Sequence, residues 1–479
     1  MKNKLAFWLF ASLAVAACGK EKEPVTEPPH QQSQATDPAA FEGMNLIFIS
    51  MDTTRADALS CYDGDRENTP NLDDFALDAA LFQDCLTQST GTAPSHRTMF
   101  TGQYVHRHSV YENTQTIVSP YTLATVLREQ GWQCAAFTGG GPVKPKYGLT
   151  GFDPHWNSKG AGPWHKIRST LGLVVPEALK WVRENKDERF FLFLHGFDPH
   201  CPYWPPDQHR VPYTNWYKGD LDSRRLCGMK DYGPLLEEGR IDQEDLRYVK
   251  DLYEAGVRAG DQYLGQFFEA LKQEGLLEKS LIVFTSDHGE SLGEHQWIGH
   301  VRMWEEQIRV PLLIRFPQGH FAGEYPQPVH HVDLMPTLLD YLKIAAPEGM
   351  QGLSLRPIFE HREDAFPTQR MRPCFFGAYQ AVRFDSRWKI SFRMDHFTEE
   401  IEEQALFDLE TDPGEQNNLF HTEDGARRFQ QILDRYQQWR QETAAEDARF
   451  RGRDSGAVLS EDDRNELNQL GYADDEEEE

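Results

Sequence analysis

The sequence has no pair of cysteines separated by two residues, which argues against a zinc ribbon. Basic residues are scarce, because 49 lysines and arginines stand against 76 aspartates and glutamates, giving a formal net charge of −27 in 479 residues. This charge argues against a nucleic-acid-binding protein that relies on a basic surface. Because the chain is acidic overall, an anionic substrate would have to be held by local groups or by a metal ion. We find no internal repeat.

The apolar run at the N-terminus is too short to cross a bilayer comfortably. Residues 1–18 combine two lysines, this run and small residues ending at Cys18, which is typical of a secretory signal. Val15 to Cys18 resembles a bacterial lipobox, whose cysteine is lipidated after cleavage. We expect an exported protein held in the cell envelope by lipidated Cys18, in the periplasm or at the outer membrane; a plain signal peptide and an uncleaved anchor are the alternatives. The proline-rich residues 19–43 predict a flexible tether.

Short apolar runs alternate with amphipathic stretches over residues 44–366. The runs predict buried strands, and the stretches with apolar residues at helical spacing predict covering helices. This alternation is typical of an α/β domain with a mostly parallel central sheet flanked by helices. The expected strands are 46–50, 134–137, 190–195, 281–286 and 311–316, and the expected helices include 121–130 and 246–271.

The pattern changes beyond about Pro367. RWKISFRM and ALFDLETDPGEQNNLF predict short antiparallel strands, and residues 426–445 predict a long charged helix. We therefore expect a smaller C-terminal subdomain over residues 367–450, with no second catalytic centre. Residues 451–479 are expected to form a charged tail whose acidic end is solvated.

Polar clusters follow several of the expected strands. Asp52 follows the first strand, Asp198 and His200 follow the third, and Asp287 with His288 follows the fourth. In open α/β sheets, ligands bind at the carboxyl edge of the strands. We therefore expect these clusters to converge on one site. Asp198 is either a ligand of a second metal or a turn residue before a proline, and the turn is favoured.

The stretch STGTAPSHRTMFTGQY, residues 89–104, offers Thr92 at the expected start of a helix. A threonine followed by a proline is ordinary chemistry for the first turn of a helix, so Thr92 could simply cap it. Alternatively, Thr92 is a nucleophile. An isolated threonine does not attack an ester at neutral pH, but a metal ion lowers the hydroxyl pKa and directs the alkoxide. Amides at the helix start would add positive potential.

Carboxylate, imidazole and hydroxyl groups together suit a divalent cation. Asp52, Thr92, Asp287 and His288 are the expected ligands, and calcium, manganese, magnesium and zinc all accept such donors with different preferences. The same groups have ordinary interpretations, since Asp52 could cap a helix and His288 could be a buried, hydrogen-bonded histidine.

Five segments of the chain carry a resemblance to a known family: NLIFISMDTTRADALSCYDGDRENTPNLDDFA, FLFLHGFDPHCPYWPP, IVFTSDHGESLGEHQWIGHVRMWEEQIRVPLLIRFP, HHVDLMPTLLDYL and LFDLETDPGEQNNL. In this order they resemble segments of the sulfatase family of the alkaline phosphatase superfamily, and the resemblance covers about residues 44–419. The resemblance implies an alkaline-phosphatase-like sandwich and an enzyme that hydrolyses anionic esters with a metal ion.

The resemblance also implies roles for individual residues. Asp52, Asp287 and His288 stand at metal-ligand positions, and Thr53 stands where many members carry a further acidic ligand. His200 looks like the histidine that contacts the ester or protonates its leaving group. His300 occupies the place of an anion-binding lysine, so it is a general acid or an anion contact.

Two residues in TAPSHRTMFTG depart from the family pattern. Thr92 replaces the cysteine or serine that is normally oxidised to formylglycine, and His96 replaces an arginine. Threonine is not the usual precursor of that aldehyde, so the usual route of sulfate release is in doubt. Related phosphodiesterases and phosphotransferases of the superfamily use an unmodified threonine, which favours Thr92 as the nucleophile. We expect His96 to support its loop.

These observations predict a metal-dependent hydrolase of sulfate or phosphate esters. Its substrate would be a sulfated or phosphorylated glycan, lipid or small molecule, with no nucleic acid as partner. One alternative is a phosphodiesterase or phosphotransferase that acts through Thr92 on lipid headgroups or envelope polymers. An alternative of another class is a catalytically inactive binding lipoprotein, against which the retained Asp52, Asp287 and His288 weigh.

Overall fold

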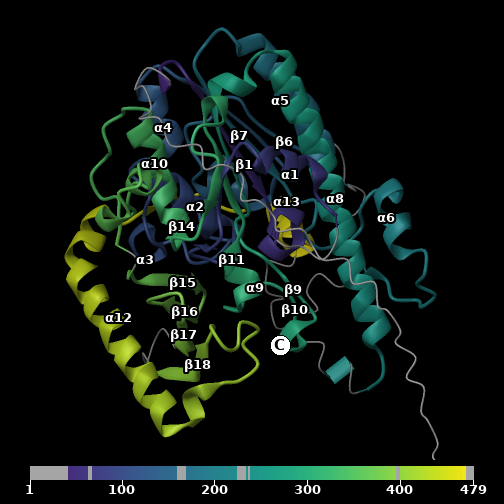
Figure 1. Ribbon diagram of the computed structural model, residues 1–479, viewed down its shortest axis with the longest axis vertical. Coiled ribbons are helices and arrows are strands. Elements are labelled where there is room, and N and C mark those ends of the chain that lie inside the picture. The colour runs from purple at the N-terminus through teal and green to yellow at the C-terminus, as the bar shows by residue number, and fades with distance from the viewer. Residues whose placement is uncertain are drawn as a thin grey trace, which may run out of the picture. The chain divides into compact units, whose positions relative to one another are not determined.

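The computed structural model describes residues 41–62, 67–158, 169–223, 234–235, 238–367, 369–394 and 400–470 (Figure 1). All of them belong to one compact unit, Pro38–Glu479. The expected signal and lipobox lie outside the described residues, as does the expected tether up to residue 40. No helix in the described part of the chain combines the length and apolar character that a membrane span requires.

A central sheet of eight strands organises the molecule. Its order is β13-β2-β12-β8-β1-β7-β5-β6, and β12 alone runs against the others, because it pairs antiparallel with both of its neighbours. The prediction of a mostly parallel sheet is confirmed. The strands are β1 (Asn45–Met51), β2 (Ala80–Phe82), β5 (Gln133–Thr138), β6 (His155–Asn157), β7 (Phe190–Gly196), β8 (Ser280–Thr285), β12 (Leu312–Arg315) and β13 (Gly323–Tyr325).

Helices cover both faces of this sheet, which explains why the central strands β1, β7 and β8 are buried along their whole length. In β1, Ile47 and Ile49 face one apolar core, whereas Leu46 and Phe48 face the other. Figure 1 shows α5 and α8 on one side of the sheet and α2, α4 and α10 on the other. The first core also receives α1 (Pro70–Ala76), α5 (Leu171–Asn185) and α8 (Gln243–Gln273), and the second receives α2 (Thr92–Thr101), α4 (Leu123–Glu129), α10 (Leu334–Tyr341) and α11 (Arg356–Phe359).

Short elements join these layers. A three-stranded sheet, β11-β3-β14, lies near the start of α2, and two small ribbons pair β9 with β10 and β4 with β19. Their bounds are β3 (Cys85–Leu86), β4 (Ile117–Val118), β9 (Ser291–Leu292), β10 (Ile298–Gly299), β11 (Arg309–Val310), β14 (Val329–His330), β19 (Arg453–Asp454), α3 (Val105–His108), α6 (Asp207–Thr214) and α9 (Glu305–Ile308).

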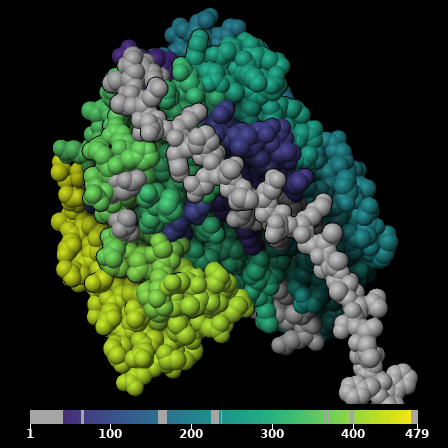
Figure 2. Space-filling model, in the orientation of Figure 1, coloured from purple at the N-terminus to yellow at the C-terminus, as the bar shows by residue number. Residues whose placement is uncertain are grey.

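The C-terminal part contains the predicted antiparallel sheet, in the order β15-β16-β17-β18. One long helix, α12, packs against it through Phe429, Leu433 and Tyr436, and is longer than expected at both ends. Figure 2 shows this green-to-yellow segment gathered in one region of the visible face. The elements are β15 (Arg372–Phe376), β16 (Tyr379–Arg383), β17 (Trp388–Met394), β18 (Ile401–Asp408) and α12 (Glu423–Phe450).

Two segments differ from the expected tether and tail. Phe41, expected in the tether, is buried among aromatic rings that include Phe316 and Tyr341. Residues 451–470, expected to be part of a charged tail, contain the helix α13 (Glu461–Gln469), which Ser460 caps and which buries Leu467. The acidic composition hid this helix, because its buried face carries few apolar residues. The last nine residues lie outside the described part of the chain.

Candidate active site

Three neighbouring strands bring the polar clusters to one edge of the central sheet. β8, β1 and β7 are adjacent and parallel, so their carboxyl ends meet. Asp52 follows β1, Asp287 and His288 follow β8, and His195 lies near the end of β7. The Asp52 N–H donates to the Gly196 carbonyl at 2.9 Å, which holds the two turns together. The predicted convergence at this edge is confirmed for these strands.

Asp52, Asp287 and His288 form a buried group whose ligand atoms all lie within 4.8 Å of one another. Asp52 Oδ1, Asp287 Oδ2 and His288 Nε2 have no hydrogen-bond partner among the described residues. The Nδ1–H of His288 donates to the Gly289 carbonyl at 3.0 Å, which leaves the Nε2 lone pair of the neutral ring available. Buried polar atoms without partners are costly, so these three residues fit a divalent cation.

The two aspartates respond differently to this enclosure. Burial, followed by the charge of Asp287, raises the pKa of Asp52 well above its usual range. Burial also acts to raise the pKa of Asp287, but His288, His96 and His195 outweigh it and bring that pKa below its usual value. A cation between two such carboxylates would relieve their repulsion and keep both ionised.

Thr92 points its hydroxyl at this group. It is the first residue of α2 and fully buried, and its Oγ1 donates to Asp52 Oδ2 at 3.1 Å. The N-cap residue of α2 is Gly91, and Thr92 is the first residue inside the helix, so Thr92 does not occupy the N-cap position. One amide of the first turn is already used, since Ala93 N–H donates to Asn113 Oδ1 at 2.8 Å.

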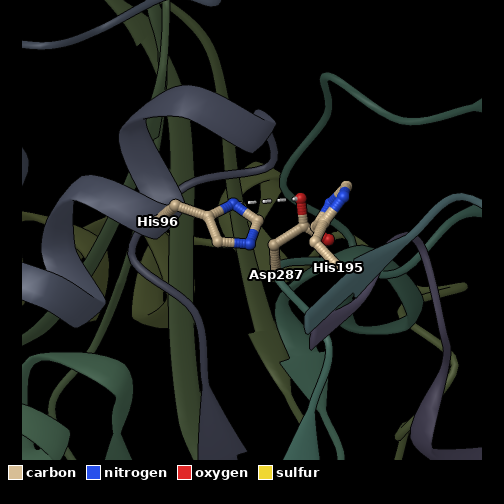
Figure 3. A group of neighbouring side chains, drawn as sticks. All are labelled: His96, His195 and Asp287. Carbon is tan, nitrogen blue, oxygen red and sulfur yellow. Dashed lines mark ion pairs between the residues drawn. The ribbon is translucent and has the colours of Figure 1, made fainter. Parts of the chain in front are cut away.

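His96 and His195 flank Asp287 from α2 and β7 (Figure 3). The Nδ1–H of His96 donates to the Thr92 carbonyl at 2.8 Å, and its Nε2 lies 3.0 Å from Ser50 Oγ. His96 Nδ1 also lies 3.8 Å from Asp287 Oδ2, and His195 Nε2 lies 3.3 Å from Asp52 Oδ2. Burial lowers the pKa of both histidines. Both rings therefore lie against the carboxylates of the group.

Thr53 follows Asp52 in a left-handed conformation, with φ of 55°. Its N–H donates to Asp287 Oδ1 at 3.3 Å. The backbone at this position therefore supports one aspartate of the group, and the threonine brings no additional carboxylate.

His200 and His300 lie together beside His288. The His300 ring centroid is 4.5 Å from that of His288 and 5.2 Å from that of His200. His300 Nδ1 is 3.1 Å from Glu290 Oε1, whereas His200 Nδ1–H donates to the Cys201 carbonyl. Burial raises the pKa of Glu290 to about 7 and lowers that of His200 to about 4. The expected grouping of His200 and His300 is present.

Sequence reasoning missed His195 and Glu290. The place of His195 at the end of the apolar run FLFLHG is the sequence signal that marks it. Glu290 carries no such signal, because an acidic residue two positions after His288 is unremarkable until the fold places it beside His300.

Two other residues after β7, Asp198 and Cys201, are engaged in structural contacts. Asp198 accepts hydrogen bonds from the Ser169 hydroxyl, from Thr170 Oγ1 at 3.0 Å and from Leu171 N–H at 2.9 Å, so its carboxylate is held at the start of α5. Cys201 is engaged in a disulfide, which rules out a free thiol beside His200.

Comparison with known families agrees with this geometry. Residues 44–344 match the family described as Sulfatase. The chain belongs to the sulfatase family. Residues 293–442 of this sulfatase also match a family described as N-sulphoglucosamine sulphohydrolase, C-terminal. The family resemblance inferred from the sequence is confirmed, and with it the assignment to hydrolases that act on esters.

Individual relatives cover most of this sulfatase. N-acetylglucosamine-6-O-sulfatase of Bacteroides thetaiotaomicron is 25% identical over 88% of this chain and 88% of its own. A solved structure in complex with its substrate D-glucosamine-2-N,6-O-disulfate has a TM-score of 0.70 at 21% identity, covering 85% of this chain and 98% of that one. Phosphonate monoester hydrolase of Agrobacterium radiobacter has a TM-score of 0.65 at 21% identity, covering 88% and 98%. These structures confirm the sulfatase fold.

Proposed function

We propose that this protein hydrolyses a sulfate ester or a related phosphorus ester with Thr92 as its nucleophile. The observation that carries the proposal is the hydrogen bond from Thr92 Oγ1 to Asp52 Oδ2 at 3.1 Å, beside three ligand atoms without partners. Asp52, Asp287 and His288, with Thr92, would hold a divalent cation. When bound, the cation supplies Lewis-acid chemistry, which makes the hydroxyl more acidic and stabilises negative charge on the ester. The carboxylate, imidazole and hydroxyl donors of this site suit calcium, magnesium, manganese or zinc.

In the proposed reaction, the Thr92 oxygen attacks the sulfur or phosphorus atom while its proton moves along the hydrogen bond toward Asp52. The bond from that atom to the ester oxygen breaks, and the departing oxygen takes a proton from a histidine. Water then attacks the sulfur or phosphorus atom of the intermediate on Thr92, which restores the hydroxyl and releases sulfate, a phosphate monoester or a phosphonate according to the substrate. An alcohol in place of water would make the same site a transferase.

His300 is better placed than His200 to protonate the departing oxygen. Burial lowers the pKa of His200 to about 4, so this ring is neutral at neutral pH and its Nδ1–H is engaged with a carbonyl. His300 faces Glu290, whose pKa is raised by burial to about 7, so the pair can retain a proton near neutral pH. His200 would instead contact the ester.

His96 supports the nucleophile rather than the ester. Its Nδ1–H holds the carbonyl of Thr92 and its Nε2 reaches Ser50, so the ring ties the first turn of α2 to β1. This arrangement fixes the direction of the Thr92 side chain.

A phosphorus ester is the second candidate substrate. It is favoured by the threonine at the nucleophile position, which bears a hydroxyl where the family resemblance implies a formylglycine precursor. The similarity in fold to a phosphonate monoester hydrolase supports it further. The same active site would then act on a phosphodiester or a phosphonate, in a lipid headgroup or an envelope polymer.

The remaining part of the substrate would be an organic group of some size. Trp304 lines a cavity of about 890 Å³ together with Tyr379, Asn418 and other aromatic, amide and acidic side chains, and its lining includes Gln296 and Arg302, which stand on either side of His300 in the chain. Aromatic faces with amide donors are typical of sites that bind hydroxylated rings. A sulfated glycan fits this lining and also agrees with the named substrates of relatives.

The location of the protein rests on residues outside the described part of the chain. We propose that the chain is exported and anchored in the cell envelope by lipidated Cys18, because residues 1–18 have the features of a lipoprotein signal. Globomycin, which blocks cleavage of lipoprotein signals, should leave a larger precursor, and Cys18→Ser should release the protein from membranes.

Turnover measurements with matched esters test the proposed function. An aryl sulfate, an aryl phosphonate and a phosphodiester with the same leaving group are compared for the wild type, Thr92→Ser and Thr92→Ala, with each of the four metals. We expect one ester class to react, Thr92→Ser to retain activity, and Thr92→Ala to lose about 10³-fold or more. Activity that survives in Thr92→Ala would refute the nucleophile. Absence of turnover and of metal binding would favour an inactive binding lipoprotein.

A further inference from the structure

We propose that Lys144, Lys146 and the Gly141 amide form a second anion-binding subsite beside the active site, which α13 occupies with its own carboxylates. A second anionic group on the substrate, such as a sulfate or a carboxylate, would displace α13 from this subsite. The identity of that ligand rests on the proposed function, whereas the subsite itself rests on the contacts of α13.

The carboxylates of α13 are held as an anion would be held. Glu466 accepts a hydrogen bond from Gly141 N–H at 2.7 Å and forms an ion pair with Lys144. Asp463 forms an ion pair with Lys146 and lies 3.9 Å from the Nζ of Lys144. Both carboxylates are nearly buried, at 5% and 6% exposed. Two ammonium groups and one amide therefore surround two carboxylates.

The docked face of α13 is half charged and half apolar. Asp463, Glu466, Leu467 and Leu470 recur at helical spacing and are its buried residues, and only two of them are apolar. Residues 455–459 before the helix are largely exposed, and Ser455 N–H donates to the Thr116 carbonyl at 3.0 Å. An anion that binds the same lysines and amide would compete with these carboxylates and favour the state in which the helix is released.

The subsite lies next to the catalytic residues. Leu470 packs on Phe197, whose ring centroid is 4.5 Å from that of His195 and 5.5 Å from that of His200. His195 in turn contacts Asp52. Gly141 and Lys144 belong to the turn after β5, at the same carboxyl edge of the sheet. An anion at Lys144 would therefore lie on the same side of the sheet edge as the ester.

The expected ligand follows from the charge of the subsite. The chain is strongly acidic, with a net charge of −27, so two lysines at the catalytic edge are a local exception. Lysine binds sulfate and carboxylate as a point charge, and an amide beside it adds a directed donor. A polyanionic substrate could place one anionic group at Thr92 and another at Lys144, which would favour it over a singly charged ester.

Binding of inorganic sulfate to the full chain tests this proposal without any turnover. Calorimetry is carried out on the wild type, Glu466→Gln, Lys144→Gln and the double variant. We expect Glu466→Gln to bind sulfate at least tenfold more tightly, and the double variant to lose this gain. Glu461→Gln is the matched control, because it removes one charge from the exposed face of the same helix.

Hydrogen exchange provides a second measurement that needs no variant. Sulfate added to the wild type should accelerate exchange of the amides of residues 463–470, and sodium chloride at the same ionic strength should not. If Glu466→Gln binds sulfate like the wild type, or if Glu461→Gln gains equally, the subsite is refuted. Unchanged exchange with sulfate would show that α13 is a fixed structural element. Neither test requires turnover, so both can be carried out even if the protein has no esterase activity.

Discussion

Gly91 lies so close to the ring of Phe376 that a Cβ atom at position 91 would stand 2.3 Å from Phe376 Cε2. No carbon atoms approach so closely without a shift of one of them. Gly91 precedes Thr92, and Phe376 ends β15, so the turn that presents the proposed nucleophile is packed directly against the C-terminal sheet.

Gly91→Ala should therefore displace Thr92. We expect turnover to fall by about 10²-fold, because a shift of about 1 Å at a nucleophile costs that much, and stability to fall by about 1–3 kcal/mol through overpacking. Adding Phe376→Ala should recover part of both losses. Gly414→Ala is the control, since the nearest atom to its added Cβ lies at 3.9 Å. Full activity in Gly91→Ala would contradict the packing argument.

His195→Ala should weaken metal binding while the fold is retained. His195 Nε2 lies 3.3 Å from Asp52 Oδ2 and orients that carboxylate. Loss of a residue that orients a ligand typically costs about 10–100-fold in metal affinity, and we expect that range in a chelator competition assay. The exposed His421→Ala serves as the control. Metal affinity equal to that of the wild type would show that His195 does not orient the Asp52 carboxylate for metal binding.

The rate should depend on the proton shared by His300 and Glu290. Burial raises the pKa of Glu290 to about 7, so the pair is protonated below that pH and loses its proton above it. A step that needs this proton should slow as the pH rises through about 7. In Glu290→Gln, the His300 imidazolium lacks the carboxylate that stabilises its positive charge, so the decline in kcat should begin at lower pH. Identical pH profiles for the two proteins would exclude the pair as the proton donor.

Lys389→Met should destabilise the C-terminal sheet. The Lys389 ammonium is fully buried, 2.7 Å from Glu415 Oε1 and 3.3 Å from Glu305 Oε1. Its removal leaves buried carboxylates without their cation, which typically costs about 3–5 kcal/mol, as denaturant unfolding would measure. Adding Glu415→Gln should restore part of the loss. The exposed pair Arg393 and Glu402 offers a control in which little change is expected.

The sequence allowed the core of the fold and the centre of the site to be predicted for a physical reason. Apolar runs mark strands buried on both faces, and parallel strands bring the residues after them to one edge, so Asp52, Asp287 and His288 could be grouped. The reversed direction of β12 was not predictable in this way, because an apolar run carries no sign of the direction in which its strand pairs.

The features missed by sequence reasoning depend on tertiary contacts. Glu290 gains its significance only from its approach to His300, and the helix α13 is held by ion pairs to Lys144 and Lys146, which are more than 300 positions earlier in the chain. An acidic segment with two leucines has the composition of a solvated tail until its partners are known.

The contacts of the nucleophile turn with β15 also bear on how such a chain can diversify. Phe375 N–H donates to the Gln88 carbonyl at 2.9 Å, and Ser89 forms a parallel bridge with Phe375, three residues before Thr92. The C-terminal sheet is thus a structural wall of the turn that holds Thr92, and it also lines the cavity proposed to bind the substrate. Grafting this sheet from another enzyme, in order to change substrate preference, should also shift the Thr92 hydroxyl. Under the proposed mechanism, selectivity and reactivity would therefore change together.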